Sequence, residues 1–509
     1  MTTRHDTGAG GDLHRDILTT LLPGFAGTDA PDWLLARLEG GLGGVCIFGD
    51  NITGAEQLRG LNTTLRSANR RAVIAIDEEG GDVTRLFYDR GAPYPGAALL
   101  GRLDDVDVTE RVAAAVGEAL RATGCTVTFA PDADVNTNAD NPVIGVRSFG
   151  ADPELVARHS AAWVRGVQSA GVAASAKHFP GHGDTATDSH LALPVVDVAP
   201  EVLRDRELLP FRAAIEAGTR TIMTSHILLP RIDPEHPATL SPRILNGLLR
   251  GELGFDGVIV SDALDMHAAS GVHGIPEAAV LALVAGCDLL CIGSDNTDAE
   301  LDEIVAAIDG AVASGRLPID RVRDAAARVR ALGASAPAIP DSPAVVEPHH
   351  DVVPMARLIA EFEVTDAART RLAAADRIGT IVRVDTVANI AIGVAPWGPF
   401  AAAAVSVERT WLDDVRMIAV APETPLAGPA ALAGPVLVIG KDLHLHQSAV
   451  ATIDALRAVR DDVVTVDMGW PAAGRALADI ATFGASRLVG AALIDFVAAS
   501  VALAPAESP

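Results

Sequence analysis

The chain has 509 residues and a formal net charge of −26, from 66 acidic and 40 basic residues with histidine neutral. A surface this acidic offers no broad basic face, and aromatic residues make up only 4% of the chain, so both charge and stacking chemistry argue against nucleic acid as a partner. Hydrophobic residues reach 49%, which is enough to bury a large core and argues against general disorder.

The sequence shows neither the pattern of a secretory signal nor that of a membrane-spanning helix. The N-terminus lacks a basic stretch followed by an apolar run, so we expect no secretory signal. The most apolar run, near residues 278–293, contains Asp288 and is too short to span a bilayer. We therefore expect no membrane span and a cytoplasmic location. The four cysteines are too few and too scattered for a disulfide framework, and we expect buried thiols rather than a redox or metal pair.

From residue 40 to about 295 the chain alternates short apolar, β-branched runs with longer segments of helical period. The runs that we predict as strands are 44–48, 72–77, 126–130, 172–177, 221–226, 257–262 and 288–293, with an eighth near 17–23. Continuous apolar runs with helices between them are typical of a parallel sheet covered on both faces. Eight such runs favour a closed (β/α)8 TIM barrel over an open sheet. Polar residues follow these runs, at the carboxyl-terminal mouth where barrels build their active sites.

The second part of the chain begins after a predicted helix over residues 318–332. A proline-rich stretch follows this helix and favours an extended linker. Strand-like runs then recur, with a helix over 448–460 among them, at 378–384, 416–421, 435–440, 463–468 and 487–494. The sequence therefore predicts an α/β protein with a catalytic barrel at 1–335, a linker at 336–352 and a smaller open-sheet α/β domain at 353–509.

The densest chemical signal is the segment Lys177-His-Phe-Pro-Gly-His-Gly-Asp-Thr-Ala-Thr-Asp-Ser-His190. It follows a predicted strand, and its concentration of titratable side chains has no packing explanation. Asp188 could hold one imidazole nitrogen of His190 while the other faces a substrate, which is the arrangement of a general acid/base. His178, His182, Asp188 and His190 are also competent zinc ligands, so a metal-dependent hydrolase remains an alternative. Against it, barrel metals usually draw ligands from several strands.

Three further segments place polar side chains at the predicted mouth. Gly257-Val-Ile-Val-Ser-Asp-Ala-Leu-Asp-Met266 delivers Asp262 at a strand end, where a carboxylate can attack an electrophilic carbon. Ile76-Asp-Glu-Glu-Gly-Gly-Asp-Val-Thr-Arg85 begins with Asp77, and its two glycines permit close approach of the backbone to a ligand. The two glutamates of this segment could equally lie on the surface. Asn141-Pro-Val-Ile-Gly-Val-Arg-Ser-Phe-Gly-Ala-Asp-Pro153 holds Arg147 in a constrained loop.

In this order, the four segments resemble glycoside hydrolase family 3, in particular its β-N-acetylglucosaminidase branch, over roughly residues 15–335. Lys-His-Phe-Pro-Gly-His-Gly followed by Asp-Ser-His is close to a signature of that branch, and Ser-Asp-Ala-Leu-Asp-Met matches the nucleophile segment. The resemblance implies a retaining, exo-acting β-N-acetylhexosaminidase that releases terminal N-acetylglucosamine from a small-molecule glycoside. It implies neither a metal nor an organic cofactor.

The resemblance also implies a role for each residue of the site. Asp262 is the nucleophile, and His190, held by Asp188, is the acid/base. The positions that match contacts to the sugar hydroxyls and the acetamido group are Asp77, Arg85, Arg147, Lys177 and His178. Asp82 departs from the family pattern, which commonly has a basic residue at this position.

Two questions remain open from the sequence. A neutral histidine tolerates an anion that a second carboxylate would repel, so a β-N-acetylglucosaminide phosphorylase that uses inorganic phosphate is the alternative to a hydrolase. The C-terminal domain shows no counterpart of the acid/base that other family members carry there. We expect it to serve packing or oligomerisation, with a lip over the substrate cleft as the other possibility.

Overall fold

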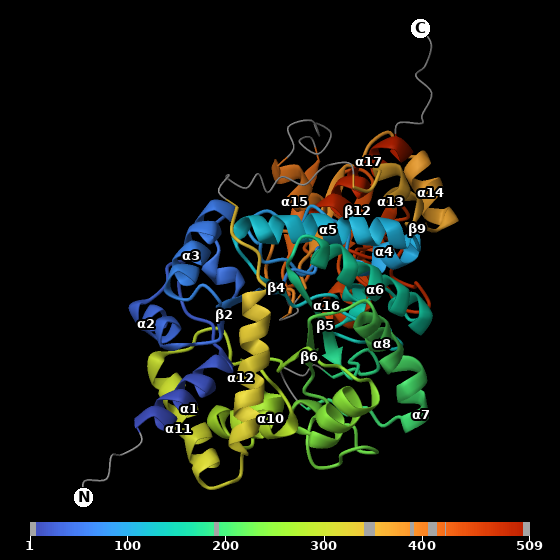
Figure 1. Ribbon diagram of the computed structural model, residues 1–509. Coiled ribbons are helices and arrows are strands. Elements are labelled where there is room, and N and C mark those ends of the chain that lie inside the picture. Colours follow the sequence, from blue (N-terminus) through green and yellow to red (C-terminus); the bar gives the residue numbers. More distant parts are fainter. Residues whose placement is uncertain are drawn as a thin grey trace, which may run out of the picture.

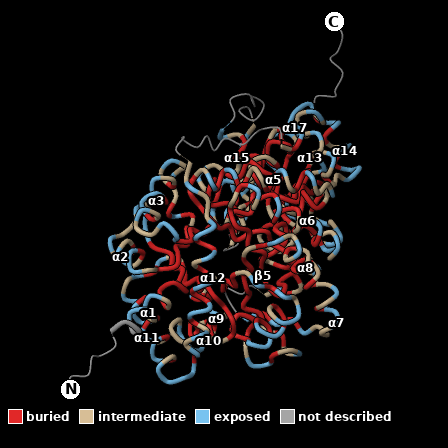
Figure 2. The backbone as a smooth tube through the Cα atoms, viewed as in Figure 1, coloured by how far each residue is buried: buried red, intermediate tan, exposed pale blue. Residues whose placement is uncertain are grey.

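A computed structural model describes residues 7–187, 193–340, 352–386, 391–405, 415–422 and 424–501. Figure 1 shows two parts: the elements coloured blue through yellow surround the strands of a barrel, and the orange and red elements gather beside α4 and α5. In Figure 2 the buried residues fill the interior of both parts, while the exposed ones lie on the outer turns of the helices. The two parts therefore correspond to two layered α/β units packed against each other.

The barrel is built from eight parallel strands. They are β1 (Leu21–Leu22), β2 (Gly44–Ile47), β3 (Val73–Ile76), β4 (Val127–Thr128), β5 (Ala173–Phe179), β6 (Thr221–Thr224), β7 (Val258–Val260) and β8 (Leu290–Cys291). β2 to β7 pair in chain order, and β1 pairs with β8. The amide of Cys46 donates to the Pro23 carbonyl (2.9 Å), and Val260 forms a parallel bridge with Leu289. These two links join the sheets into a ring.

Alternation along the strands explains which side chains reach the mouth. On β3, Val73 and Ala75 belong to the cluster that fills the lumen, whereas Ile74 belongs to the outer cluster beneath the helices. Successive side chains of a strand point to opposite faces, so Asp77, two residues beyond Ala75, lies on the lumen side at the end of the strand. The same count on β7 carries Asp262 to the mouth.

Helices cover the outside of the barrel. They are α1 (Thr7–Thr19), α2 (Asp32–Gly40), α3 (Ala55–Ala68), α4 (Ala97–Leu103), α5 (Val106–Thr123), α6 (Pro153–Ser169), α7 (Pro200–Val202), α8 (Leu208–Glu216), α9 (His267–Ser270), α10 (Ile275–Ala285), α11 (Asp298–Ala313) and α12 (Ile319–Ala334). Two π-helical turns, η3 (Leu203–Glu207) and η5 (Arg243–Glu252), flank β6. Helix α6 begins where the Asp152 carboxylate accepts from the amide of Leu155 (2.8 Å) and Pro153 occupies the first turn.

The C-terminal part is an open six-stranded sheet in the order β11-β10-β12-β13-β14-β9. Its strands are β9 (Glu363–Val364), β10 (Thr380–Val384), β11 (Arg416–Val420), β12 (Val436–Gly440), β13 (Val463–Asp467) and β14 (Ile480–Ala481). All neighbours are parallel except β14 and β9. The helices are α13 (Met355–Ala360), α14 (Asp366–Ala373), α15 (Gly398–Val405), α16 (Gln447–Arg457) and α17 (Arg487–Val501).

The predicted fold, a TIM barrel followed by a smaller open-sheet α/β domain, is confirmed. One predicted strand is wrong: residues 487–494 lie in helix α17. An apolar run of eight residues fits a buried strand or a buried helix equally well. Val489, Leu493 and Val497 are buried together at four-residue spacing, which is the period of a helix face. The short strands β9 and β14 complete the sheet in its place.

The predicted domain boundaries at 335 and 353 stay predictions. They fall between helix α12, which ends at Ala334, and helix α13, which begins at Met355. Over the ranges that the structure describes, no helix combines the length and the apolar character needed to cross a bilayer. The four cysteines are buried free thiols, as expected.

Candidate active site

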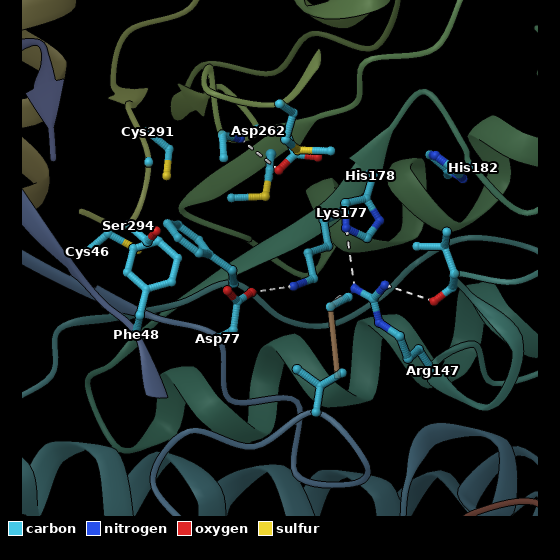
Figure 3. A pocket seen from close by; sticks show the side chains of 18 of the residues that line it. Cys46, Phe48, Asp77, Arg147, Lys177, His178, His182, Asp262, Cys291 and Ser294 are labelled. Carbon is cyan, nitrogen blue, oxygen red and sulfur yellow. Dashed lines mark hydrogen bonds and ion pairs between the residues drawn. The ribbon is translucent and has the colours of Figure 1, made fainter. Parts of the chain in front are cut away.

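A cavity of about 280 Å³ opens at the mouth of the barrel (Figure 3). Its described lining comes from the loops after several strands and from Ala391 of the C-terminal domain. Figure 3 shows Asp262 across the cavity from Asp77 and Lys177. The sequence-predicted residues that line this cavity are Asp77, Arg85, Arg147, Lys177, His178 and Asp262. The other two predicted residues, Asp188 and His190, lie outside the described residues.

A network of buried ion pairs forms the floor of this cavity. Lys177, at the end of β5, donates through Nζ to Asp77 (2.7 Å) and pairs with Glu79 (2.8 Å). The Arg147 guanidinium donates hydrogen bonds to both carboxylate oxygens of Glu79, at 2.8 and 3.1 Å. Lys177 and Arg147 expose 2% and 3% of their side chains, so both are held rigidly. Bidentate pairing of this kind fixes orientation as well as charge.

The network sets the protonation states around the cavity. Burial by itself would favour neutral Asp77, but the charges of Lys177 and Arg85 outweigh it and hold the pKa of this carboxyl below its ordinary value. Glu79 is also buried, and Arg147 and Lys177 lower its pKa to about 2. Asp77 is therefore an anion at neutral pH, which makes it a hydrogen-bond acceptor for hydroxyl groups.

Sequence reasoning missed Glu79 as the counter-ion of this network. Both glutamates of the segment are buried, at 0% and 8% exposure, so the surface alternative for them is wrong. Glu78 accepts from the Thr84 hydroxyl and from the amides of Arg85 and Leu86, at 2.8 to 3.0 Å. These bonds close the loop after β3 and bring Arg85 back to the cavity.

A second buried array lies beside the first, around Asp134. One carboxylate oxygen of Asp134 lies 2.7 Å from Nδ1 of His178, and the other accepts from the amides of His178 (3.2 Å) and His182 (2.7 Å). His178 Nε2 lies 3.4 Å from the Arg147 guanidinium. His182 is buried at 3% exposure, and burial lowers its pKa to about 4, so its ring is neutral at physiological pH. The array fixes the His178 imidazole and the main chain of His182 against the cavity wall.

The predicted metal alternative draws little support from this geometry. Within the described ranges, Asp132, Asp134 and His178 have ligand atoms within 4.8 Å of one another, a spacing that could hold an ion. Of the two predicted zinc ligands that the structure describes, His178 belongs to this group and His182 does not. The Arg147 guanidinium stands 3.6 Å from the nearer Asp132 oxygen and already supplies positive charge there.

Asp262 follows β7 and is partly buried at the cavity edge. Its amide donates to the Thr224 hydroxyl (3.2 Å), and its carboxylate accepts from the amide of Ala263 (2.8 Å). The main chain is thus fixed on the neighbouring strand β6, and the carboxylate is oriented at the mouth. A carboxylate held in this way can act as a nucleophile toward a carbon bound in the cavity.

Asp82, the departure from the family pattern, takes part in the contact between the domains. Its carboxylate accepts from the amide of Ala485 (2.8 Å), just before helix α17. Burial raises its pKa. The position therefore serves domain packing in this chain, and Asp82 is not among the residues found to line the cavity.

Glu207 is a buried carboxyl behind the loop that leads toward Asp188 and His190. It ends η3 with 1% exposure, accepts from Arg206 (2.6 Å) and packs on Gly181. Its second oxygen has no hydrogen-bond partner among the described residues. Desolvation raises its pKa to about 7. Arg206 also binds Asp184 (2.6 Å), so this cluster anchors the base of the loop.

Replacing Glu207 by glutamine should stabilise the protein at alkaline pH. The pKa of Glu207 is 4.5 in the unfolded chain and about 7 in the native protein, so the native state binds this proton more tightly. The native protein therefore loses stability as the pH rises from 4.5 to about 7, and the loss is complete above pH 7. The difference corresponds to roughly 3 kcal/mol at most. We expect Glu207→Gln to match wild type in chemical denaturation at pH 5 and to exceed it at pH 8. Equal stability of the two proteins at pH 8 would contradict the buried, ionised carboxylate.

Comparison with known proteins identifies the family to which the chain belongs. Residues 31–332 match the glycosyl hydrolase family 3 N-terminal domain. The chain belongs to glycosyl hydrolase family 3. It is therefore a glycosidase.

Several relatives of this glycosidase are similar over long stretches. The β-hexosaminidase A of Pseudoalteromonas piscicida is 34% identical over 349 residues, which is 64% of this chain and 57% of that protein. The β-hexosaminidase of Stenotrophomonas maltophilia strain K279a is 37% identical over 301 residues, or 57% of this chain and 87% of that protein. A family 3 β-N-acetylglucosaminidase structure from Paenibacillus is 31% identical with a TM-score of 0.83, and the match covers 96% of this chain and 97% of that one. Both domains are thus shared with that structure.

Proposed function

We propose that this glycosidase is a retaining, exo-acting β-N-acetylglucosaminidase with Asp262 as its nucleophile. The observation that carries the proposal is the position of Asp262, which faces an ion-paired floor of Asp77 and Lys177 across a cavity of about 280 Å³. This volume lies at the small end for ligand sites and suits a single terminal sugar. The names of the relatives, β-hexosaminidase and β-N-acetylglucosaminidase, agree with this substrate class.

The chemistry proceeds in two steps. Asp262 attacks the anomeric carbon, the bond to the leaving oxygen breaks, and a glycosyl-enzyme ester forms. His190 in its protonated form donates a proton to the leaving oxygen. The same histidine, now neutral, then takes a proton from water as the water attacks the anomeric carbon and releases Asp262. Two displacements at one carbon retain its configuration.

The acid/base role goes to His190, with Asp188 as its partner, on the strength of the family resemblance. His178 is the competing imidazole in the described residues. Its ring is held between Asp134 (2.7 Å) and Arg147 (3.4 Å), which suits a fixed contact to the sugar better than a group that must exchange protons with a leaving group and with water.

Water is the acceptor in this proposal, and the case for phosphate weakens. The phosphorylase alternative relied on a neutral histidine beside the acceptor, and local positive potential from Lys177 and Arg147 would add to it. Both of these cations are ion-paired, Lys177 with Asp77 and Glu79, and Arg147 with Glu79. Lys177 and Arg147 therefore offer a phosphate dianion little uncompensated charge, although Arg85, whose guanidinium donates to neutral main-chain carbonyls, also lines the cavity. Turnover in the presence of millimolar phosphate should yield N-acetylglucosamine, and a product dominated by the sugar 1-phosphate would reverse this choice. A cytoplasmic location also remains part of the proposal.

Aryl N-acetylglucosaminides should be better substrates than the corresponding glucosides. The resemblance directs Arg147, Lys177 and His178 at the sugar hydroxyls and the acetamido group, and all three are rigidly held. A site built to hydrogen-bond a group rejects an analogue that lacks it, because buried polar partners are then left unpaired. We expect kcat/KM to differ by about 100-fold or more. Specificity constants for the two p-nitrophenyl glycosides measure this directly, and a faster glucoside would refute the substrate class.

A further inference from the structure

Residues 391–394 of the C-terminal domain lie directly on the loop that follows β3 of the barrel. The carbonyls of Ala391 and Ile392 accept from the two Nη atoms of Arg85, at 2.5 and 3.1 Å. The amide of Val394 donates to the Tyr88 hydroxyl (3.2 Å). Ala391 is also the described residue through which the C-terminal domain lines the sugar cavity. A segment 300 residues away in sequence thus forms part of the cavity wall.

Arg85 depends on this segment for the position of its guanidinium. The barrel fixes the main chain of Arg85, since its amide donates to Glu78 (3.0 Å). The guanidinium donates to main-chain carbonyls, one of its own loop at 3.5 Å and two of the C-terminal domain. Arg85 lines the cavity with 8% exposure, and its charge helps to keep Asp77 ionised. A long arginine side chain that is held before binding loses less entropy when the ligand arrives.

We propose that residues 391–394 are a positioning element for Arg85, and that the C-terminal domain thereby sets the affinity of the barrel for its sugar. The inference rests on the proposed function in one respect, the contact between Arg85 and the sugar. It assigns the C-terminal domain a role in the cavity wall beyond packing. We expect its effect to fall on substrate binding, because the proposed function gives Arg85 a contact with the sugar and no part in the attack by Asp262.

Gly393 supplies a variant that separates this role from general stability. It has a φ of +75°, and a Cβ added there would lie 2.7 Å from the Tyr88 hydroxyl. Gly393→Ala therefore forces the segment and the Tyr88 hydroxyl apart, and we expect the carbonyls of Ala391 and Ile392 to shift relative to Arg85. Gly428, in the same domain, is the matched control, because its φ is +59° and the nearest atom to an added Cβ is 3.9 Å away. Both substitutions carry the backbone strain of a positive φ, and only the first collides.

The test is a double-mutant cycle on an aryl N-acetylglucosaminide. We expect Gly393→Ala to raise KM about 10-fold with kcat changed less than about 3-fold, the size expected for weakened hydrogen bonds to a charged group. Gly428→Ala should keep the wild-type KM. In an Arg85→Ala background, adding Gly393→Ala should cost nothing further in kcat/KM. A wild-type KM for Gly393→Ala, or an equal loss in the Arg85→Ala background, would overturn the proposal.

A second variant covers the case in which Gly393→Ala does not fold. Tyr88→Phe removes the hydroxyl that holds Val394 without adding volume, and we expect a smaller rise in KM that also disappears in the Arg85→Ala background. An unchanged KM would overturn the proposal. Failure of the proposed function can be distinguished from failure of this inference. An enzyme that prefers aryl glucosides would refute the proposed substrate, and the same cycle run on the glucoside would still test the positioning of Arg85.

Discussion

Asp262→Ala should lower kcat/KM for an aryl N-acetylglucosaminide by about 10⁴-fold or more. The variant lacks the only group that the proposal allows to attack the anomeric carbon, so the covalent route is closed. Stability should change little, because Asp262 lies at the cavity edge outside the lumen cluster and its side chain makes a local bond to the amide of Ala263. Steady-state kinetics and thermal unfolding of the same preparation measure both quantities.

Asp256 provides the matched control for this experiment. It precedes the same strand, β7, and is exposed at the opposite end of the barrel. Asp256→Ala removes an identical carboxylate from the same element and should keep activity within about 2-fold, as expected of a surface substitution. Near-normal turnover by Asp262→Ala, or a comparable loss in Asp256→Ala, would show that the nucleophile lies elsewhere.

His190→Ala should slow poor leaving groups far more than good ones. A dinitrophenolate departs without protonation, whereas an alkyl alcohol requires a proton from the acid, so the penalty should grow from about 10-fold to about 10³-fold along the series. Azide should partly restore turnover of activated substrates, because it attacks the glycosyl-enzyme without general-base help. The dependence of log kcat/KM on leaving-group pKa measures the effect.

His178→Ala is the discriminating control, since His178 lines the cavity and forms an imidazole–carboxylate pair with Asp134. As a sugar contact, His178 should lower kcat/KM by a similar factor for every leaving group. If instead the His178 variant shows the steep dependence and the His190 variant the uniform loss, the assignment of the acid/base must be exchanged between them.

Local patterns in the sequence predict most of the barrel. Alternation along β3, from Val73 and Ala75 in the lumen to Asp77 at the mouth, follows from a period of two, and the same count brings Asp262 to the cavity edge. Residues at these positions can be predicted because the active-site side chains of a parallel barrel lie at the carboxyl-terminal ends of its strands. The apolar run at 487–494 fails for the converse reason, since periodicity cannot separate a short buried strand from a helix.

Partnerships between distant segments are beyond such patterns. Glu79 pairs with Arg147 and Lys177, 68 and 98 positions away. The local sequence around Glu79 does not predict which cation it pairs with. The contact of Arg85 with Ala391 and Ile392 uses main-chain carbonyls, which any residue type supplies. Sequence reasoning found Lys177 and Arg147 but could not foresee that neighbouring carboxylates neutralise these two cations, and this difference weakens one argument for phosphate as acceptor.

Trapping of the glycosyl-enzyme tests the central claim most directly. A 5-fluoro-N-acetylglucosaminyl fluoride slows both steps through its electronegative ring substituent, while its good leaving group lets the first step proceed, so the ester accumulates. Proteolysis and mass spectrometry then locate the added sugar. We predict one label per chain, on the carboxylate of Asp262, and no label on Asp262→Ala. A label on Asp265, Asp77 or any other carboxylate, or turnover with no ester formed, would contradict the mechanism.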